Sequence, residues 1–277
     1  MKRKVINFYW LALFLSSQDC YADIYFWTDE QGKKHFSDTE HSGAQTYQEA
    51  QHKSLFSIKS IFDGDTVQLK DGRKIRLVGI NTPEVAHRNN PAQEGGEAAK
   101  KWLTKLLIGK KVRLEFAEQK QDKYKRYLAH LFTEEGLHIN LELVRLGFAS
   151  VNIFPPNIAY VDELVGASDT AEKKKLGIWQ YPSYAIKPVH ELNLNNKYGW
   201  QRIVGKIISI QQTKKSVYLI ISNTFKLRIK KQFLHFFTNV GELQGKTVEA
   251  RGWVNKSRNQ MLMQIKHPSV LKIVNEN

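Results

Sequence analysis

The sequence predicts a mainly β fold with α-helices (α+β): a small five-stranded Greek-key barrel of oligonucleotide-binding (OB) type with three helices, followed by a second, basic OB-like barrel. Three observations support this prediction. Two groups of five short segments alternate apolar and polar residues with period two, as half-buried strands do. Three stretches within the first group have apolar residues at helical spacing instead. A stretch rich in proline and asparagine lies between the two groups.

The chain has 277 residues, and single hydrophobic cores usually stop growing near ~250 residues, so we expect more than one domain. Changes in composition divide it into five predicted segments: a signal peptide at 1–22, a small hairpin domain with a linker at 23–52, a first barrel domain at 53–181, a linker at 182–198 and a basic barrel domain at 199–277. The 42% content of hydrophobic residues is enough for packed cores.

The first 22 residues have the three parts of a secretory signal peptide. A positive stretch at 1–4 precedes a mostly apolar stretch at 5–15, and Ala22 is a small residue at the expected cleavage site. The apolar stretch is shorter than the roughly 20 residues that a spanning helix needs, so we expect cleavage and no stable membrane anchor. An uncleaved anchor is the alternative. Cys20 is the only cysteine, so neither a disulfide nor a thiolate metal site is expected in the mature chain.

A small hairpin is predicted directly after this segment. The apolar stretches 24–27 and 34–36 flank a turn at 29–32. The segment resembles a small domain of unknown function that follows signal peptides in many Gram-negative secreted proteins. The resemblance implies an exported protein, periplasmic or secreted from a Gram-negative bacterium, and implies nothing about chemistry.

The first barrel is predicted from strands and helices that interleave. Its strands are expected at 55–61, 65–70, 73–80, 111–117 and 126–132. Asp71-Gly72 is a hairpin signal between the second and third strands. Its helices are expected at 94–108, 141–146 and 158–175. We expect Asn140 to cap the second helix.

The C-terminal part carries most of the positive charge. The chain has a net charge of +15, and residues 183–277 hold 16 basic and 4 acidic residues. This asymmetry predicts a polyanionic partner, although a solvated basic surface is the alternative. Strands are expected at 201–210, 216–221, 224–229, 246–253 and 261–266, with a helix at 231–238.

The strand at 224–229 and its continuation alternate basic and apolar residues. This places Lys226, Arg228 and Lys230 on one face, with aromatic residues nearby in the sequence. A basic face with aromatic side chains suits single-stranded nucleic acid. The alternative is that the aromatic residues fill the barrel core and the basic residues are solvated.

Two strings, at 61–69 and 75–84, hold polar residues that a fold alone would not require. They supply oxygen ligands, a guanidinium group and carboxylates, in the residues Asp63, Asp65, Arg76, Asn81, Thr82 and Glu84. Attack on a phosphodiester builds negative charge on the phosphoryl oxygens, so its catalysis relies on positioning and electrostatic stabilisation. Arginine suits this task because its planar fork donates two hydrogen bonds and stays charged.

Four ordered motifs make the chemistry more specific. They are Asp-Gly-Asp-Thr at 63–66, Arg-Leu-x-x-Ile-x-Thr-Pro-Glu at 76–84, Asp-Lys-Tyr-x-Arg-x-Leu-Ala at 122–129 and Lys-Lys-Lys-Leu-Gly-Ile-Trp at 173–179. With these motifs, residues 55–180 resemble the staphylococcal nuclease (thermonuclease) family. The resemblance implies that Arg76 and Arg126 are catalytic arginines and that Glu84 is the base that activates water. A structural salt bridge, for example between Arg76 and Glu84, is the alternative.

The resemblance also implies binding residues. Asp65, Asn81 and the main-chain carbonyl of Thr82 match the positions that hold Ca²⁺, and Asp63 matches a position that stabilises the turn. Asn81 stands where the family has a second aspartate, so the two side chains supply a charge of −1 rather than −2 and we expect weaker calcium affinity. Lys123 and Tyr124 match residues that contact the terminal phosphate of a bound nucleotide.

Two further departures from the family pattern affect the nucleotide site. Lys125 replaces the usual glycine before the arginine, and the segment 150–154 lacks the tyrosines that flank the family's nucleotide pocket. Phe154 remains able to stack a base.

These observations predict an exported calcium-dependent nuclease that hydrolyses DNA or RNA with low sequence specificity and leaves 3′-phosphate ends. The expected partner is nucleic acid, with single strands favoured, and we expect a monomer. The alternative is a catalytically weakened nuclease fold that acts as a nucleic-acid-binding module, and Asn81 is its main support. An envelope scaffolding protein is a third reading, which rests only on the hairpin and the tandem domains.

Overall fold

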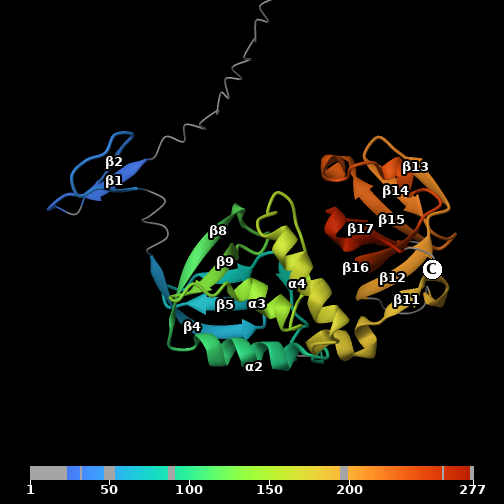
Figure 1. Cartoon of the computed structure of the whole chain (residues 1–277), viewed down its shortest axis with the longest axis horizontal. Helices are drawn as coiled ribbons and strands as arrows, with labels where there is room; N and C mark the ends of the chain where they lie inside the picture. The colour runs from blue at the N-terminus through green and yellow to red at the C-terminus, as the bar shows by residue number, and fades with distance from the viewer. Residues whose placement is uncertain are drawn as a thin grey trace, which may run out of the picture. The chain divides into compact units, whose positions relative to one another are not determined.

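The computed structural model describes residues 24–31, 33–46, 54–86, 91–193, 199–257 and 259–274 (Figure 1). Its contacts divide the chain into two units, Met1–His52 and Lys53–Asn277. The signal peptide expected at 1–22 lies outside the described residues. No helix in the described ranges is both long enough and apolar enough to cross a membrane.

The N-terminal unit is a three-stranded antiparallel sheet. It consists of β1 (Tyr25–Thr28), β2 (Lys34–Ser37) and β3 (Gln45–Thr46) in the order β2-β1-β3, so a third strand joins the predicted hairpin. Asp29 closes the turn, because its Oδ1 accepts hydrogen bonds from the main-chain N–H groups of Gln31 and Lys33. The Trp27 ring stacks on the rings of His35 and His41.

The second unit begins with a closed barrel, which confirms the predicted OB-type fold (Figure 1). Its strands are β4 (Leu55–Asp63), β5 (Thr66–Leu69), β6 (Lys74–Leu77), β9 (Tyr127–Thr133) and β8 (Lys111–Gln121), in that order around the barrel. The pairing of β6 with β9 is parallel, and the other four are antiparallel. The period-two pattern places alternate apolar side chains in the core, among them Val67, Leu69, Ile75 and Leu77.

Three helices accompany the barrel, as predicted. They are α2 (Gly96–Leu107), α3 (Ile139–Arg145) and α4 (Val161–Lys173). The expected role of Asn140 is wrong: α3 starts after His138, and Asn140 lies buried within it. Its amide links α3 to the barrel instead, because Oδ1 accepts from the Leu131 main-chain N–H and Nδ2 donates to the Val78 carbonyl.

Two short strands complete the part of the fold that holds the site. They are β7 (Ile80–Asn81) and β10 (Ser150–Val151), which pair antiparallel. This pairing ties the segment after β6 to the segment after α3, and the Ser150 hydroxyl also donates to the Asn81 carbonyl.

The described residues of 186–193 and 199–274 form a second β-rich region with its own hydrophobic core, named here the C-terminal β domain. Its sheet has the order β11-β12-β16-β17-β15-β14-β13, with β18 (Leu271–Ile273) paired to β16. The strands are β11 (Ile186–Pro188), β12 (Trp200–Lys206), β13 (Ser209–Gln212), β14 (Ser216–Ile220), β15 (Phe225–Lys230), β16 (Thr247–Ser257) and β17 (Gln260–Ile265).

Two sequence expectations differ from this structure. The helix expected at 231–238 is instead a shorter 3₁₀ helix, Lys231–Phe236, from which Phe233 and Leu234 pack against the core. Part of the linker expected at 182–198 is ordered, because β11 adds to the edge of the sheet and pairs parallel with β12.

An ion-pair network joins α4 to the C-terminal β domain. Glu172 of α4 accepts from both Arg202 of β12 and Arg251 of β16, and Glu249 of β16 accepts from the Nε of the same two arginines at 2.9 and 2.6 Å. The Arg202 guanidinium also lies 5.2 Å from the centroid of the Trp179 ring. These contacts hold the two β-rich regions together in one unit.

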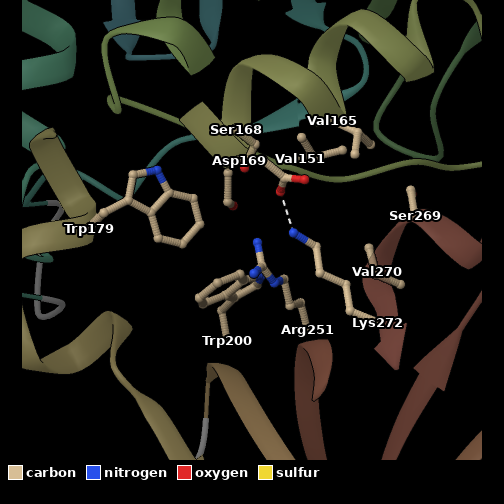
Figure 2. Close-up of a pocket in the computed structure, with 11 residues that line it drawn as sticks. Val151, Val165, Ser168, Asp169, Trp179, Trp200, Arg251, Ser269, Val270 and Lys272 are labelled. Atoms are coloured by element: carbon tan, nitrogen blue, oxygen red, sulfur yellow. Dashed lines mark hydrogen bonds and ion pairs between the residues drawn. The ribbon is translucent and has the colours of Figure 1, made fainter. Parts of the chain in front are cut away.

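The small pocket in Figure 2 lies between α4 and the C-terminal β domain. Lys272 reaches across it to pair with Asp169 of α4, beside Trp179, Trp200 and Arg251. Its volume of about 10 Å³ is room for one water molecule, so this pocket is part of the packing between the domains and no ligand site.

Candidate active site

Arg76 lies on β6, opposite Thr66 of β5 and next to Leu128 of β9. Its Nη2 is 2.9 Å from Oδ2 of Asp65, and its Nη1 donates to the Leu77 carbonyl at 2.7 Å. The ion-pair partner of Arg76 is therefore Asp65 and not Glu84. Because the Arg76 side chain is only 14% exposed, these bonds orient its guanidinium within a largely buried setting.

Asp65 connects three parts of the site. Besides Arg76, its Oδ2 accepts a hydrogen bond from the Thr82 main-chain N–H at 2.8 Å. The turn before it has the expected stabilising residue, since Oδ1 of Asp63 accepts from the Asp65 main-chain N–H at 2.9 Å. Burial, together with the nearby charge of Asp65, raises the pKa of Asp63 to about 7.

Arg126 is held by a residue that the sequence analysis did not select. Asp122 Oδ2 accepts from Nε and Nη2 of Arg126 at 2.8 and 2.7 Å, and its Oδ1 accepts from the main-chain N–H groups of Tyr124 and Arg126. One carboxylate thus closes the turn and aims the guanidinium. In the sequence, the signal for this contact is the spacing of four residues between Asp122 and Arg126 within one motif.

Glu84 lies exposed on the segment after β7, where its main-chain N–H donates to the Gln93 side chain. Partial burial and the charge of Asp65 raise the pKa of Glu84, whereas the charges of Arg76 and Arg126 oppose this rise. The carboxylate therefore lies within electrostatic range of both arginines. A raised pKa brings a carboxylate closer to the range in which it accepts a proton effectively.

The three predicted calcium ligands are neighbours, but their oxygens are engaged within the protein. Asn81 donates from Nδ2 to the Thr82 carbonyl at 3.2 Å, and its Oδ1 accepts from Arg76 Nη2 at 3.3 Å. No cluster of three or more His, Cys, Asp or Glu residues that could hold a metal occurs in the described ranges. One carboxylate and two neutral carbonyl oxygens fit a weakly held Ca²⁺, which takes hard oxygen ligands and would complete its shell from water or substrate.

The amide of Asn81 decides whether these oxygens are available. A half-turn of the amide would replace Nδ2 by Oδ1 beside the Thr82 carbonyl, and two acceptor oxygens are adjacent favourably only with a cation between them. The same half-turn would direct an N–H group at the Arg76 guanidinium, which opposes it. Both effects would make calcium binding weaker at this site than at one with an aspartate in place of Asn81.

A cleft of about 740 Å³ brings the two predicted catalytic arginines and the predicted phosphate-binding residues together, whereas Glu84, Asp65, Asn81 and Thr82 are not among the described residues that line it. Arg76, Arg126, Lys123 and Tyr124 line it. The Tyr124 ring is 67% exposed and has Lys123 Nζ 4.8 Å and the Arg126 guanidinium 5.5 Å from its centroid. The cations of Lys123 and Arg126 and the exposed Tyr124 ring thus meet in the cleft that Arg76 also lines.

Lys125 lies between these residues in a strained conformation. Its φ of 62° is in the left-handed region, which glycine adopts without steric cost. We expect Lys125→Gly to raise the free energy of unfolding by about 0.5–1 kcal/mol, because relief of a cost of roughly 1–2 kcal/mol exceeds the extra entropy that glycine loses on folding. Urea denaturation measures this change.

The matched control is Lys120→Gly on β8, where φ is not positive. Lys120→Gly should lower the free energy of unfolding. An equal decrease in Lys125→Gly would contradict the inference that Lys125 is strained.

The basic residues of β15 face outward, as predicted. Phe225, Leu227 and Ile229 are buried, and Lys226, Arg228 and Lys230 alternate with them. Lys226 donates to Gln260 and Arg228 to Gln264, both on β17. These three basic residues do not line the cleft.

Of the aromatic residues near β15 in the sequence, some are packed inside the protein, as the core alternative predicts, and one is exposed, as nucleic-acid binding requires. Phe225 is fully buried, and Trp200 packs on Trp179 and Tyr184. Trp253, in contrast, is 41% exposed and lines the cleft that contains Arg76 and Arg126. Sequence reasoning grouped Trp253 with Trp200, Tyr218 and Phe225 as aromatic residues near the basic face, but its place at this cleft depends on the packing of the two domains.

Comparisons with known proteins agree with this geometry. A family described as staphylococcal nuclease homologue matches residues 74–181, and a domain of unknown function (DUF4124) matches residues 11–53. The thermonuclease of Staphylococcus intermedius is 37% identical over 128 residues, covering 45% of this chain and 76% of the relative. The thermonuclease of Staphylococcus hyicus is 32% identical over 131 residues, covering 46% and 77%. Endonuclease YhcR of Bacillus subtilis (strain 168) is 34% identical over 134 residues, covering 44% and 11%. Both resemblances expected from the motifs are confirmed.

Proposed function

We propose, from the premise that this chain belongs to the staphylococcal nuclease family, that it is an exported calcium-dependent nuclease. It hydrolyses phosphodiester bonds of DNA or RNA with low sequence specificity and leaves 3′-phosphate ends. One observation carries the proposal: Arg76 and Arg126 line a single cleft, and each is aimed by its own carboxylate. A fold retained only for its shape would not require two oriented guanidinium groups at one cleft.

The residues divide the reaction between them. Glu84 takes a proton from a water molecule as the water oxygen bonds to phosphorus and the bond from phosphorus to the 5′ oxygen breaks. Arg76 and Arg126 donate hydrogen bonds to the phosphoryl oxygens, on which negative charge develops. Lys123 and Tyr124 hold an adjacent phosphate. The leaving 5′ oxygen takes up a proton, and the 3′ end keeps the phosphate.

Calcium would be held by Asp65, Asn81 and the Thr82 carbonyl. When bound, it supplies positive charge that polarises a phosphoryl oxygen. Export rests on the tripartite pattern of residues 1–22 and on the hairpin domain that follows it. A preference for single strands and a monomeric state remain predictions.

A calcium titration tests the function and the role of Asn81 together. We expect hydrolysis of single-stranded and double-stranded DNA that a chelator abolishes, and we expect Asn81→Asp to lower the calcium concentration for half-maximal rate by about tenfold, because ligand charge tunes calcium affinity. Asn223→Asp adds the same charge at an exposed turn and should leave that concentration unchanged.

Absence of hydrolysis at millimolar calcium in both the unaltered chain and Asn81→Asp would overturn the proposal that the protein is a nuclease. The hydrogen bond from Asn81 to the Thr82 carbonyl favours the second candidate, a nucleic-acid-binding module. In that case nucleic acid would still bind, with a strong dependence on salt.

A further inference from the structure

Trp253 belongs to the C-terminal β domain but lines the cleft of the nuclease domain. It lies on β16 between two residues that face the other way: Val254 is buried in the domain core, and Gly252 lies over Met263. Its indole is therefore on the outer face of the sheet and is 41% exposed. An exposed indole beside two arginines offers a flat apolar surface next to a phosphate site.

Lys266, just after β17, reaches the same region. Its Nζ lies 3.3 Å from the centroid of the Phe154 ring, and Phe154 also lines the cleft. Burial, together with the charges of Lys230 and Lys123, lowers the pKa of Lys266 to about 8. Lys230 and Lys123, one from each domain, therefore both lie within electrostatic range of Lys266. Among the ion pairs of the described residues, none includes any of the three.

The packing between the domains holds this arrangement in place. Arg251, two residues before Trp253 on β16, is bonded to Glu172 of α4 and to Glu249. Both Arg251 and Glu249 are largely buried, so the strand that carries Trp253 is anchored to the nuclease domain. A composite surface of this kind is preorganised for a ligand rather than assembled by it.

We propose that the C-terminal β domain supplies a strand-binding subsite of the nuclease cleft, in which Trp253 stacks a base of single-stranded nucleic acid and Lys266, with Lys230 and Lys123, binds its phosphates. The proposal rests on the proposed function, since it names the substrate form that this cleft takes.

The chemistry of the subsite selects a single strand. Every base has a π-face that an aromatic ring can stack on, but in a duplex both faces are covered by neighbouring base pairs. The phosphates of the same strand supply negative charges with which the three lysines can pair. The cleft volume of about 740 Å³ is in the usual range of roughly 300–1,000 Å³ for small-ligand sites, so it has room for a short piece of strand.

The basic face of β15 extends this subsite. β15 runs parallel to β17 with Arg228 opposite Gln264, so Lys230 lies at the end of the row that leads toward Lys266. The row ends beside Lys266, which contacts the cleft residue Phe154, and a strand bound in the cleft is expected to continue over this row.

Binding of a fluorescent oligodeoxythymidylate of about ten nucleotides tests the subsite, with the full chain carrying Glu84→Gln so that the oligonucleotide is not cut. We expect Trp253→Ala to raise Kd by about tenfold, the effect of losing one stacked base, and Trp253→Phe to retain most of the affinity. We expect Lys266→Gln to reduce the slope of log K against log salt by about 0.7, the value for one phosphate contact on a single strand. A duplex of the same length should show a smaller effect of Trp253→Ala.

Two matched controls lie on the C-terminal β domain away from the cleft. Ile208→Ala removes an exposed apolar side chain, and Lys215→Gln removes an exposed lysine, so neither should change Kd or the salt slope. Photocrosslinking with 5-iodouracil in the oligonucleotide should mark Trp253 in the chain that carries only Glu84→Gln. Because Trp253 and the lysines are unchanged in that chain, this test does not depend on how well their variants fold.

The outcomes separate this subsite from the nuclease activity. Hydrolysis by the unaltered chain, with an unchanged Kd in Trp253→Ala and no crosslink at Trp253, would overturn the subsite and leave the nuclease standing. A crosslink and a weakened Kd in a chain that hydrolyses nothing would support the subsite and overturn the nuclease. A loss of affinity equal to that of the controls would also overturn the subsite.

Discussion

Replacing Arg126 by lysine is expected to lower kcat by about a hundredfold to a thousandfold, the usual effect of removing one donor that stabilises the transition state. Lysine keeps the charge but cannot reproduce the two hydrogen bonds that Arg126 donates from Nε and Nη2 to Asp122, or present a planar fork to the phosphoryl group. The measurement is kcat on single-stranded DNA at saturating calcium. Arg145→Lys is the control, because Arg145 is an exposed arginine on α3 with a paired Glu142.

The same experiment separates positioning from charge. Asp122→Asn leaves Arg126 charged but removes the carboxylate that aims it, so kcat should fall while the free energy of unfolding changes little. A rate for Arg126→Lys within threefold of the unaltered chain would show that this guanidinium does not contact the reacting phosphate.

Replacing Glu249 by glutamine is expected to lower the free energy of unfolding by about 3–5 kcal/mol, the usual cost of breaking a buried ion pair by removing one partner. The side chains of Arg202, Arg251 and Glu249 are 5%, 8% and 7% exposed. The arginines hold the pKa of Glu249 below its usual value against the effect of its burial, which shows that the ionised carboxylate is favoured there. With glutamine, two buried guanidinium groups would share Glu172 alone.

Urea unfolding followed by circular dichroism and tryptophan fluorescence measures this loss, and Trp179 reports on the network directly because the Arg202 guanidinium lies over its ring. Glu142→Gln is the matched control: its partner Arg145 is 61% exposed, and exposed pairs contribute about 0–1 kcal/mol. Similar small losses in both variants would mean that the network is not a main link between the domains.

The local patterns predicted the elements of the first barrel well. Period-two alternation at Val67, Leu69, Ile75 and Leu77 is a property of each strand alone, and all four side chains are buried as expected. The three helices were predicted for the same reason. Asn140 shows where local reasoning fails: its cap signal was real, but a barrel carbonyl and a barrel N–H compete more strongly for its amide.

The candidate site could be predicted in its residue types but not in its bonds. Sequence motifs identified both arginines, yet Asp65 as the partner of Arg76 depends on β5 and β6 being paired at Thr66 and Arg76. The engagement of the Thr82 carbonyl by Asn81 likewise depends on side-chain orientation, which no motif contains.

The sequence by itself determined the barrel, the family and the chemical groups of the site, because strand periodicity and motif spacing are short-range properties of the chain. Only the tertiary structure decided which groups meet. Trp253 lines a cleft whose arginines lie more than a hundred residues earlier, and Lys266 contacts Phe154 of the same cleft, because Glu172 and Glu249 anchor β16 against the nuclease domain. Contacts between distant segments arise from packing and charge pairing in space, and these are absent from the local pattern.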